Sequence, residues 1–259
     1  MVGADPFDST AVGHPEQIAL PTAERLDGLR LGVPTELSTT DGIEPGVLEA
    51  FEAALQHARD LGATITTCSL PTAPQALSAY YVIAPAEASS NLSRFDGVRY
   101  GLRADADDLV SMYTHTRHDG FGAEVKRRIL IGTYALSSGY YDAYYGRAQK
   151  ARTLIVREFD SVFADVDLVV TPTSPGVAFE LGAKTADPLA MYLNDFFTVP
   201  MSLAGIPAIS IPAGLSEGLP VGLQLAGPAF SENRILSAAH ALEQAIGFDG
   251  SPARTAVPA

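Results

Sequence analysis

The fold class is decided by a stretch of 42 residues, Leu29 to Leu70, which reads LRLGVPTELSTTDGIEPGVLEAFEAALQHARDLGATITTCSL. It predicts a strand over Leu29–Val33 that stops at Pro34. Apolar residues at helical spacing then predict a helix from about Pro45 to Leu61, closed by Gly62. A second strand follows over Thr64–Leu70. Strand, helix and strand in so few residues indicate a βαβ unit with parallel strands and a right-handed crossover.

The remainder of the chain continues the alternation of helices and strands. We expect helices over 73–94, over 122–163 with a break or bend near Ser138-Gly139, and over 232–246. The segment 188–203 is helical in pattern but interrupted at Pro200. Short strands are expected at 168–170, 208–213 and 221–226, and 95–119 reads as polar and irregular. The predicted fold is α/β, a mixed β-sheet covered by helices.

Three segments describe the domain organisation. Residues 1–28 contain prolines and early acidic residues without periodicity, and are expected to form an irregular connector. Residues 29–250 are expected to form the folded domain, and 251–259 are expected to form a flexible tail.

Composition limits the functional classes. The 259 residues are 47% hydrophobic and 18% charged, with a formal net charge of −13, which disfavours a protein that grips phosphate backbones on its own. Cys68 is the only cysteine, so a disulfide framework is excluded and a cytoplasmic location is the default. The N-terminus has no signal-peptide pattern, and no apolar run is long enough to predict a membrane span.

The residues by themselves present no clear catalytic constellation. His115 and His118 have the spacing of a metal pair but lack a convincing third ligand. Neither a phosphate-binding glycine loop nor a Gly-x-Ser-x-Gly elbow is present. Cys68 lies in a strand-like run, where a packed thiol is expected. The paired serines at 89–90 and 137–138 lie in helical runs and are expected to pack rather than react.

Several motifs nevertheless carry a resemblance to a known family. Gly120-Phe-Gly-Ala-Glu-Val-Lys-Arg-Arg-Ile129 is followed by a tyrosine-rich segment that ends at Tyr145. The other motifs are Asp5-Pro-Phe-Asp-Ser-Thr10, Leu29-Arg-Leu-Gly-Val-Pro34, the segment Glu87–Gly101, the segment Asp187–Asp195, Ala204-Gly-Ile-Pro-Ala-Ile-Ser-Ile-Pro212 and Gly218-Leu-Pro-Val-Gly-Leu-Gln-Leu225. Together they resemble the amidase signature family, over about Asp5 to Phe248. The segments around Arg94 and Arg128 are similar to its glutaminase branch, which serves the glutamyl-tRNA(Gln)/aspartyl-tRNA(Asn) amidotransferases as their A subunits.

The resemblance also implies that the catalytic triad of the family is missing from this sequence. Enzymes of this family use a Ser–cis-Ser–Lys triad, in which the lysine activates the nucleophilic serine. The motifs that carry the triad precede the Asp-Ser-Thr segment and would fall upstream of Met1. The resemblance therefore implies the C-terminal part of the amidase signature fold, with no catalytic residue of its own. We expect this chain to be inactive and poorly soluble alone, with an exposed strand edge and apolar patch, and to be rescued by the missing half.

The resemblance implies that this chain contains the residues with which the family selects glutamine. The family's three glutamine-binding residues fall on Arg128, Asp195 and Tyr80, with Arg127 the nearest alternative to Arg128. A guanidinium can bind an α-carboxylate bidentately, a carboxylate can accept from an α-ammonium, and a phenol can add a hydrogen bond. On spacing alone, each has an ordinary alternative role: a surface charge, a turn residue and a packing residue.

Partners and cofactors follow from the resemblance only. The expected partners are glutamine, the B and C subunits of the amidotransferase, and mischarged tRNA reached through the complex. No cofactor or metal is expected on this chain, because ATP and Mg²⁺ are used by the partner subunit. Two alternatives stay open: a fragment of another amidase signature hydrolase, and a non-catalytic scaffold that binds an amino acid or docks a partner.

Overall fold

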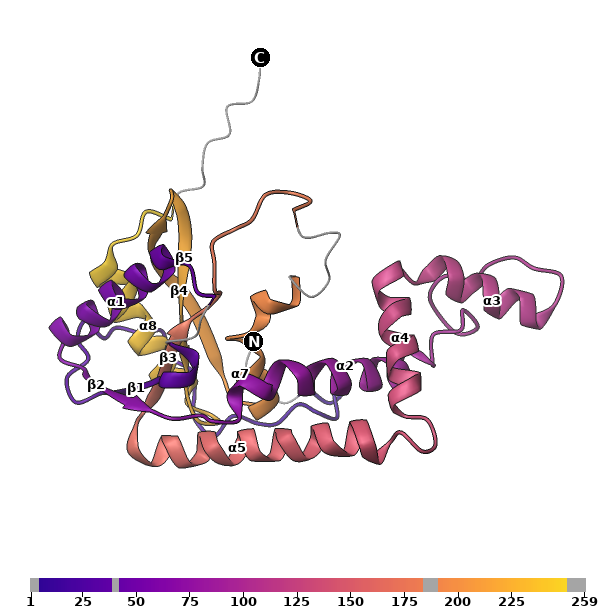
Figure 1. Cartoon of the computed structure of the whole chain (residues 1–259), viewed down its shortest axis with the longest axis horizontal. Coiled ribbons are helices and arrows are strands. Elements are labelled where there is room, and N and C mark those ends of the chain that lie inside the picture. Colours follow the sequence, from indigo (N-terminus) through magenta and orange to yellow (C-terminus); the bar gives the residue numbers. More distant parts are fainter. Residues whose placement is uncertain (1–4, 39–41, 184–190, 251–259) are drawn as a thin grey trace, which may run out of the picture. The chain divides into compact units, whose positions relative to one another are not determined.

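The structure is a computed structural model, and it describes residues 5–38, 42–183 and 191–250. The chain divides into two compact units (Figure 1). We call Met1–Pro74 with Ile155–Ala259 the sheet unit, and Gln75–Leu154 the helical unit. Each is described by itself. Within the described residues, no helix is both long enough and apolar enough to cross a membrane.

The sheet unit is built on five strands in the order β2-β1-β3-β5-β4. Their bounds are β1 Arg30–Pro34, β2 Thr64–Cys68, β3 Leu168–Pro172, β4 Ala208–Ser216 and β5 Leu219–Ala226. β1 pairs in parallel with β2 and with β3, whereas β5 pairs antiparallel with β3 and with β4. The predicted mixed sheet is therefore confirmed, and so is the parallel pair formed by the opening strand–helix–strand stretch.

Two helices cover one face of this sheet. Helix α1 (Pro45–Asp60) and helix α8 (Glu232–Ile246) pack against each other and both contact β4 (Figure 1). Their apolar stripes bury large side chains such as Phe51 and Leu242, which join Leu31 and Leu225 of the sheet in one hydrophobic core. Burial of this apolar surface is the main stabilising contribution to the unit.

On the opposite face of the sheet, strand β1 carries a glycine, Gly32, where neighbouring side chains approach closely. A Cβ added to Gly32 would lie 3.0 Å from the side chain of Val166 and 3.1 Å from the Sγ of Cys68. Val166 directly follows helix α5 (Arg147–Asp165), whose later turns bury Ile155 and Phe159. The absence of a side chain at Gly32 thus allows close packing on this face.

Strand β4 forms one end of the sheet. The amide of Gly227 donates to the carbonyl of Pro207 at 3.1 Å. This bond determines which residues of β4 form their backbone hydrogen bonds with β5. In an antiparallel pair, alternate residues then direct their backbone groups away from the partner strand: here Ala208, Ser210 and Pro212. Pro212 has no N–H, and a register shift follows it between Pro212 and Gly214.

The helical unit consists of α2 (Ala76–Leu92), α3 (Leu109–Gly120), α4 (Ala123–Ala135), a π-helix (Asp142–Gly146) and the first turns of α5. Helices α2 and α4 pack closely at Gly132, since this residue has no side chain. A Cβ added there would lie only 1.9 Å from the carbonyl oxygen of Pro85. The hydroxyls of Ser89 and Thr133 join the same two helices at 2.8 Å. The buried apolar residues of this unit are mostly small.

Three expectations need correction. Residues 109–119 are not irregular but form most of α3, because the Asp108 carboxylate caps its first turn, accepting from the amides of Val110 and Ser111 at 2.9 and 3.0 Å. Pro200 does not interrupt a helix; it lies in the first turn of α7 (Val199–Ala204), where a missing N–H costs nothing. The strand predicted to reach Leu70 ends at Cys68. Short 3₁₀ helices occupy Thr35–Leu37, Ala73–Gln75 and Leu193–Asp195.

Candidate functional site

Arg128 and Tyr80 lie together in the helical unit although 48 residues separate them in sequence. Arg128 projects from α4 and Tyr80 from the first turns of α2, and the close packing of these helices brings the two side chains into contact. The Nη1 of Arg128 donates to the hydroxyl of Tyr80 at 3.1 Å. Nothing in the spacing predicts this contact, and only the family resemblance paired the two residues.

Glu124 is the second partner of Arg128. Its carboxylate accepts from the Nε of Arg128 at 3.0 Å and also pairs with the guanidinium of Arg127. One carboxylate thus balances two guanidinium groups, which leaves one net positive charge among these three side chains. The hydrogen bond to Tyr80 and the ion pair with Glu124 raise the pKa of Arg128 above its already high value, so its charge is permanent.

The guanidinium of Arg128 is positioned by contacts on three sides. Its Cζ lies 5.9 Å from the ring centroid of Tyr81, and that ring meets Tyr80 edge-on with centroids 4.9 Å apart. With Nε bound to Glu124 and Nη1 to Tyr80, the described residues provide no hydrogen-bond partner for Nη2. The Nη1–Nη2 edge is the part of a guanidinium that binds a carboxylate end-on. The Arg128 side chain as a whole is 30% exposed.

Arg127 has a different environment. Its side chain is half exposed, and its described partner is Glu124. A surface ion pair of this kind positions a guanidinium weakly. The geometry supports Arg128 over Arg127 as the carboxylate-binding residue.

Asp195 lies in the other unit, at the end of the 3₁₀ helix Leu193–Asp195. Its backbone carbonyl accepts from the amide and the hydroxyl of Thr198, both at 3.2 Å. Its side chain is exposed, and within the described ranges no hydrogen bond or ion pair to its carboxylate is seen. The preceding motif residues 187–190 lie outside the described residues. Whether Asp195 joins Arg128 and Tyr80 around one ligand stays a prediction.

Sequence reasoning missed Glu124 as part of this site. The signal was present, since Glu124 and Arg128 are one helical turn apart and such pairs face each other. It also missed a neighbouring polar network between α2 and the chain after α4. There the hydroxyl of Tyr145 donates to Glu87 at 2.7 Å and accepts from Gln149 at 2.9 Å.

The other chemical candidates find little support. Among residues 5–38, 42–183 and 191–250, no group of three or more His, Cys, Asp or Glu side chains is arranged to hold a metal ion. His118 Nδ1 lies 2.7 Å from Asp119 at the surface. Burial, with Glu36 nearby, raises the pKa of the Cys68 thiol to about 11, so the unreactive protonated form prevails at neutral pH.

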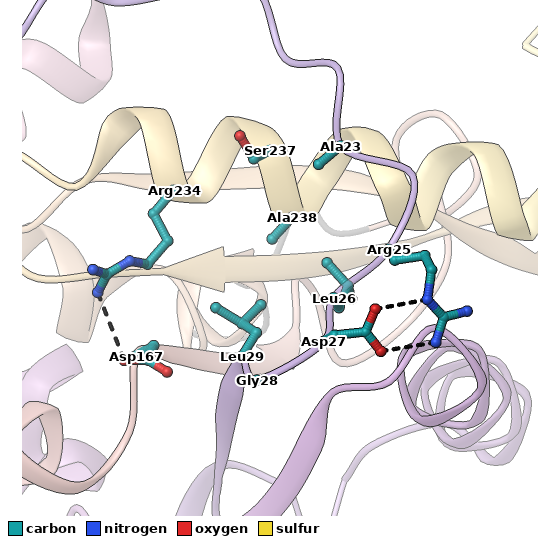
Figure 2. Close-up of a pocket in the computed structure, with 10 residues that line it drawn as sticks. All are labelled: Ala23, Arg25, Leu26, Asp27, Gly28, Leu29, Asp167, Arg234, Ser237 and Ala238. Atoms are coloured by element: carbon teal, nitrogen blue, oxygen red, sulfur yellow. Dashed lines mark hydrogen bonds and ion pairs between the residues drawn. The ribbon is translucent and has the colours of Figure 1, made fainter.

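A pocket of about 330 Å³ lies in the sheet unit and contains none of the predicted site residues (Figure 2). Its charged side chains are already paired with each other. Arg25 donates twice to Asp27, at 2.7 and 2.8 Å, and Arg234 lies 3.7 Å from Asp167. Asp167 is also bound by Arg30 at 3.0 Å, so each charged side chain that lines the pocket already has a partner of opposite charge within the protein.

Comparison with known proteins finds a matching family model and close relatives in sequence. The family model described as Amidase matches residues 1–236. The A subunit of the glutamyl-tRNA(Gln) amidotransferase of Caldanaerobacter subterraneus subsp. tengcongensis is 55% identical over 255 residues, which cover 97% of this chain and 52% of that protein. The same subunit of Brevibacillus brevis is 52% identical, over 96% of this chain and 51% of that protein. The chain thus spans about half the length of these relatives.

Solved structures agree. The crystal structure of the A subunit of the glutamyl-tRNA(Gln) amidotransferase of Thermotoga maritima matches with a TM-score of 0.71 and 40% identity, over 93% of this chain and 48% of that one. A bacterial aryl acylamidase of the amidase signature enzymes, at 20% identity and a TM-score of 0.64 over 86% of this chain and 44% of that one, shares the fold alone. With its motifs, its mixed α/β sheet, and both the family model and these relatives in agreement, the chain belongs to the amidase signature family.

Proposed function

We propose that this chain is part of the glutaminase subunit (the A subunit) of a tRNA-dependent amidotransferase, and that it holds the α-groups of glutamine. Its curated relatives at 52–55% identity are named as the A subunit of glutamyl-tRNA(Gln) amidotransferase, which supports the assignment within the family. The observation that carries the binding role is Arg128, fixed by Tyr80 and Glu124 so that one edge of its guanidinium is available.

In this proposal each residue has a separate task. The Nη1–Nη2 edge of Arg128 binds the α-carboxylate bidentately, and the permanent positive charge of Arg128 favours that anion. The hydroxyl of Tyr80 turns from Arg128 toward the same carboxylate or stays to orient the guanidinium. Asp195 accepts from the α-ammonium. These contacts distinguish an amino acid from a simple amide, because a simple amide has neither group.

The hydrolytic chemistry belongs to residues outside this sequence in this proposal. A Ser–cis-Ser–Lys triad, carried by a segment that corresponds to the other half of the relatives, attacks the side-chain amide of glutamine and releases ammonia. The ammonia passes to a partner subunit in the complex with the B and C subunits, and that partner uses ATP and Mg²⁺ to activate the mischarged tRNA. This chain binds neither cofactor itself, and its place of action is the cytoplasm, where translation occurs.

Two alternatives make different use of Arg128. A fragment of an amidase for uncharged amides has no need of an amino-acid clamp, so its activity would not depend on Arg128. A non-catalytic amino-acid-binding module or scaffold would bind its ligand or partner without any hydrolysis. The site geometry favours the glutaminase, because Arg128 is held in place by two partners and aromatic packing rather than being a free surface charge.

The test is glutaminase activity of this chain alone and mixed with the N-terminal half of the Caldanaerobacter relative. Ammonia release is expected only in the mixture. In the mixture, Arg128→Met should raise the KM for glutamine by about 100-fold, since losing one charge-paired contact costs about 2–3 kcal/mol. The matched control is Arg127→Met, in the neighbouring position on the same helix, which should change KM less than about 3-fold.

Each outcome separates the hypotheses. Activity of this chain alone would contradict the absence of a triad. Activity in the mixture that survives Arg128→Met would indicate an amidase for uncharged amides. A folded mixture that binds but does not hydrolyse glutamine would indicate a binding module.

A further inference from the structure

The helical unit exposes its large apolar side chains and buries its small ones. Its buried apolar residues are mainly alanines, with Ile83 and Met112 as the larger exceptions. Its exposed large apolar residues include Phe95, Val98, Tyr100, Leu102, Leu109, Val110, Leu130, Ile131 and Tyr134. Where such side chains gather at one site, they are typical of a surface that another molecule covers.

The same unit carries an unusual charge for this protein. It holds ten of the 17 Lys and Arg residues and eight of the 30 Asp and Glu residues, so its net charge is +2, whereas the rest of the chain carries seven basic and 22 acidic residues and a net charge of −15. A partner that is attracted to this unit in particular, and not to the whole protein, is therefore expected to be acidic.

Apolar surface and positive charge meet in one pocket of about 270 Å³ between the end of α3 and α4. Phe121, Ile129 and Leu130 supply its apolar lining, and Arg117, His118 and Lys126 supply its basic lining. The Leu130 side chain is 71% exposed. The pocket can therefore take a bulky apolar side chain while cations lie at its rim.

Two of the basic side chains, Arg117 and Lys126, form no ion pair with a described carboxylate. The Nη1 of Arg117 donates to the carbonyls of Leu92 and Phe95 at 3.0 and 2.9 Å, and its Cζ lies 5.0 Å from the ring centroid of Phe121. The Nζ of Lys126 donates to the carbonyl of His118 at 3.0 Å. Carbonyl contacts hold these side chains in place without cancelling their charge, and no carboxylate in the described part of the chain forms an ion pair with either. The Asp119 carboxylate, which pairs with His118, interacts with Lys126 only beyond ion-pair distance.

We infer that this pocket docks a segment of a partner protein in which a bulky apolar side chain is flanked by Asp or Glu. The apolar side chain fills the space between Phe121, Ile129 and Leu130, and the carboxylates pair with Lys126 and Arg117. A protein segment fits better than a nucleic acid, because the lining offers two fixed cations and aliphatic side chains rather than the continuous basic groove that a phosphate backbone requires. The inference is independent of the glutamine site.

The test measures fluorescence anisotropy of a labelled acidic peptide, Glu-Asp-Phe-Leu-Asp-Glu, titrated with the full chain. Leu130→Asp and Lys126→Glu should each weaken binding at least about tenfold, the equivalent of about 1.4 kcal/mol. The matched controls are Leu154→Asp and Lys150→Glu, which lie one turn apart on α5 as Lys126 and Leu130 do on α4. Leu154 is 51% exposed, and both controls lie outside the pocket in the same unit.

The controls should bind as the unmodified chain does, and added salt should weaken the complex because the contacts are charged. Three results would overturn the inference: no binding of the acidic peptide up to about 1 mM, equal losses in the pocket variants and the controls, or tighter binding of a basic peptide with the same Phe-Leu centre or of a single-stranded RNA oligonucleotide.

Discussion

In the sheet unit the fully buried positions carry residues such as Phe51, Leu168 and Leu225, whereas in the helical unit they carry mostly alanine. The sheet unit gains its stability from burying large apolar side chains between strands and helices. The helical unit relies on close backbone approach at Gly132 and on hydrogen bonds between its helices. One unit is thus stabilised by a core of large apolar side chains, whereas the other exposes most of its large apolar side chains and carries a net positive charge.

The largest expected effect is on the core of the sheet unit. Leu225→Ala removes a fully buried side chain from the central part of β5 and should lower the free energy of unfolding by about 3–5 kcal/mol. Urea unfolding followed by circular dichroism measures the change. Leu215→Ala on the neighbouring strand β4 is the control, because its side chain is exposed and should change stability by less than about 0.5 kcal/mol. Equal effects would mean that the core does not dominate this unit.

A smaller and more local effect is expected at the contact of α2 with α4. Gly132→Ala places a Cβ 1.9 Å from the Pro85 carbonyl, so the helices must separate, at a cost of about 2–3 kcal/mol. Amide hydrogen exchange should show lost protection in α2 and α4 and unchanged protection in β3 and β5. Gly122→Ala, at a position with open space, is the control. Loss of protection throughout the sheet would contradict the distinction between the two units.

The third effect depends on pH. Asp167 accepts from the backbone amide of Arg30 at 2.8 Å and from its guanidinium at 3.2 and 3.0 Å, and the hydrogen bond from the Arg30 side chain lowers the pKa of Asp167. Because the folded-state pKa is depressed, this stabilisation is present above the unfolded-state pKa of about 3.9 and is lost as the pH falls through the folded-state value.

Asp167→Asn should therefore destabilise the sheet unit by about 1 kcal/mol at pH 7, and by less as the pH falls below about 4. Thermal unfolding of both proteins across this pH range measures the difference. A constant difference at every pH would show that the carboxylate charge is not what stabilises the strand β1.

The smallest effect concerns the helix that sequence patterns failed to predict. Asp108→Ala removes the cap of α3 and should speed hydrogen exchange at the amides of Val110 and Ser111, with little change in global stability because the site is exposed. The neighbouring Asp107→Ala is the control, since its side chain makes no capping bond in the described structure. Equal exchange in both variants would indicate that α3 does not depend on its cap.

Sequence patterns predicted the parts of the fold in which local and tertiary preferences agree. The stripe of α1 and the closing helix α8 face the core as their spacing requires, and the strand runs before Pro34 and Pro172 pair in the mixed sheet. α3 was missed because its residues are polar with few apolar repeats, so the cap at Asp108 is its strongest signal. Pro200 was misread because a proline marks both the end and the start of helices.

Only part of the candidate site could be predicted from the sequence. The pairing of Glu124 with Arg128 could be predicted from their spacing of four residues on one helix. The contact of Arg128 with Tyr80 could not, because it depends on how closely α2 and α4 approach at Gly132. The family resemblance selected both residues before any geometry was known. It also selected Asp195, whose role around the same ligand stays a prediction.

The proline in the end strand β4 limits how a second molecule can pair with this edge of the sheet. A strand from a second molecule could add to β4 at Ala208 and Ser210, but Pro212 offers no N–H at the next outward position, and the shift in register after it misaligns the rest. Cross-β aggregation needs an uninterrupted ladder of such bonds. Pro212 therefore acts as a gatekeeper that limits strand addition at the β4 edge to a few residues.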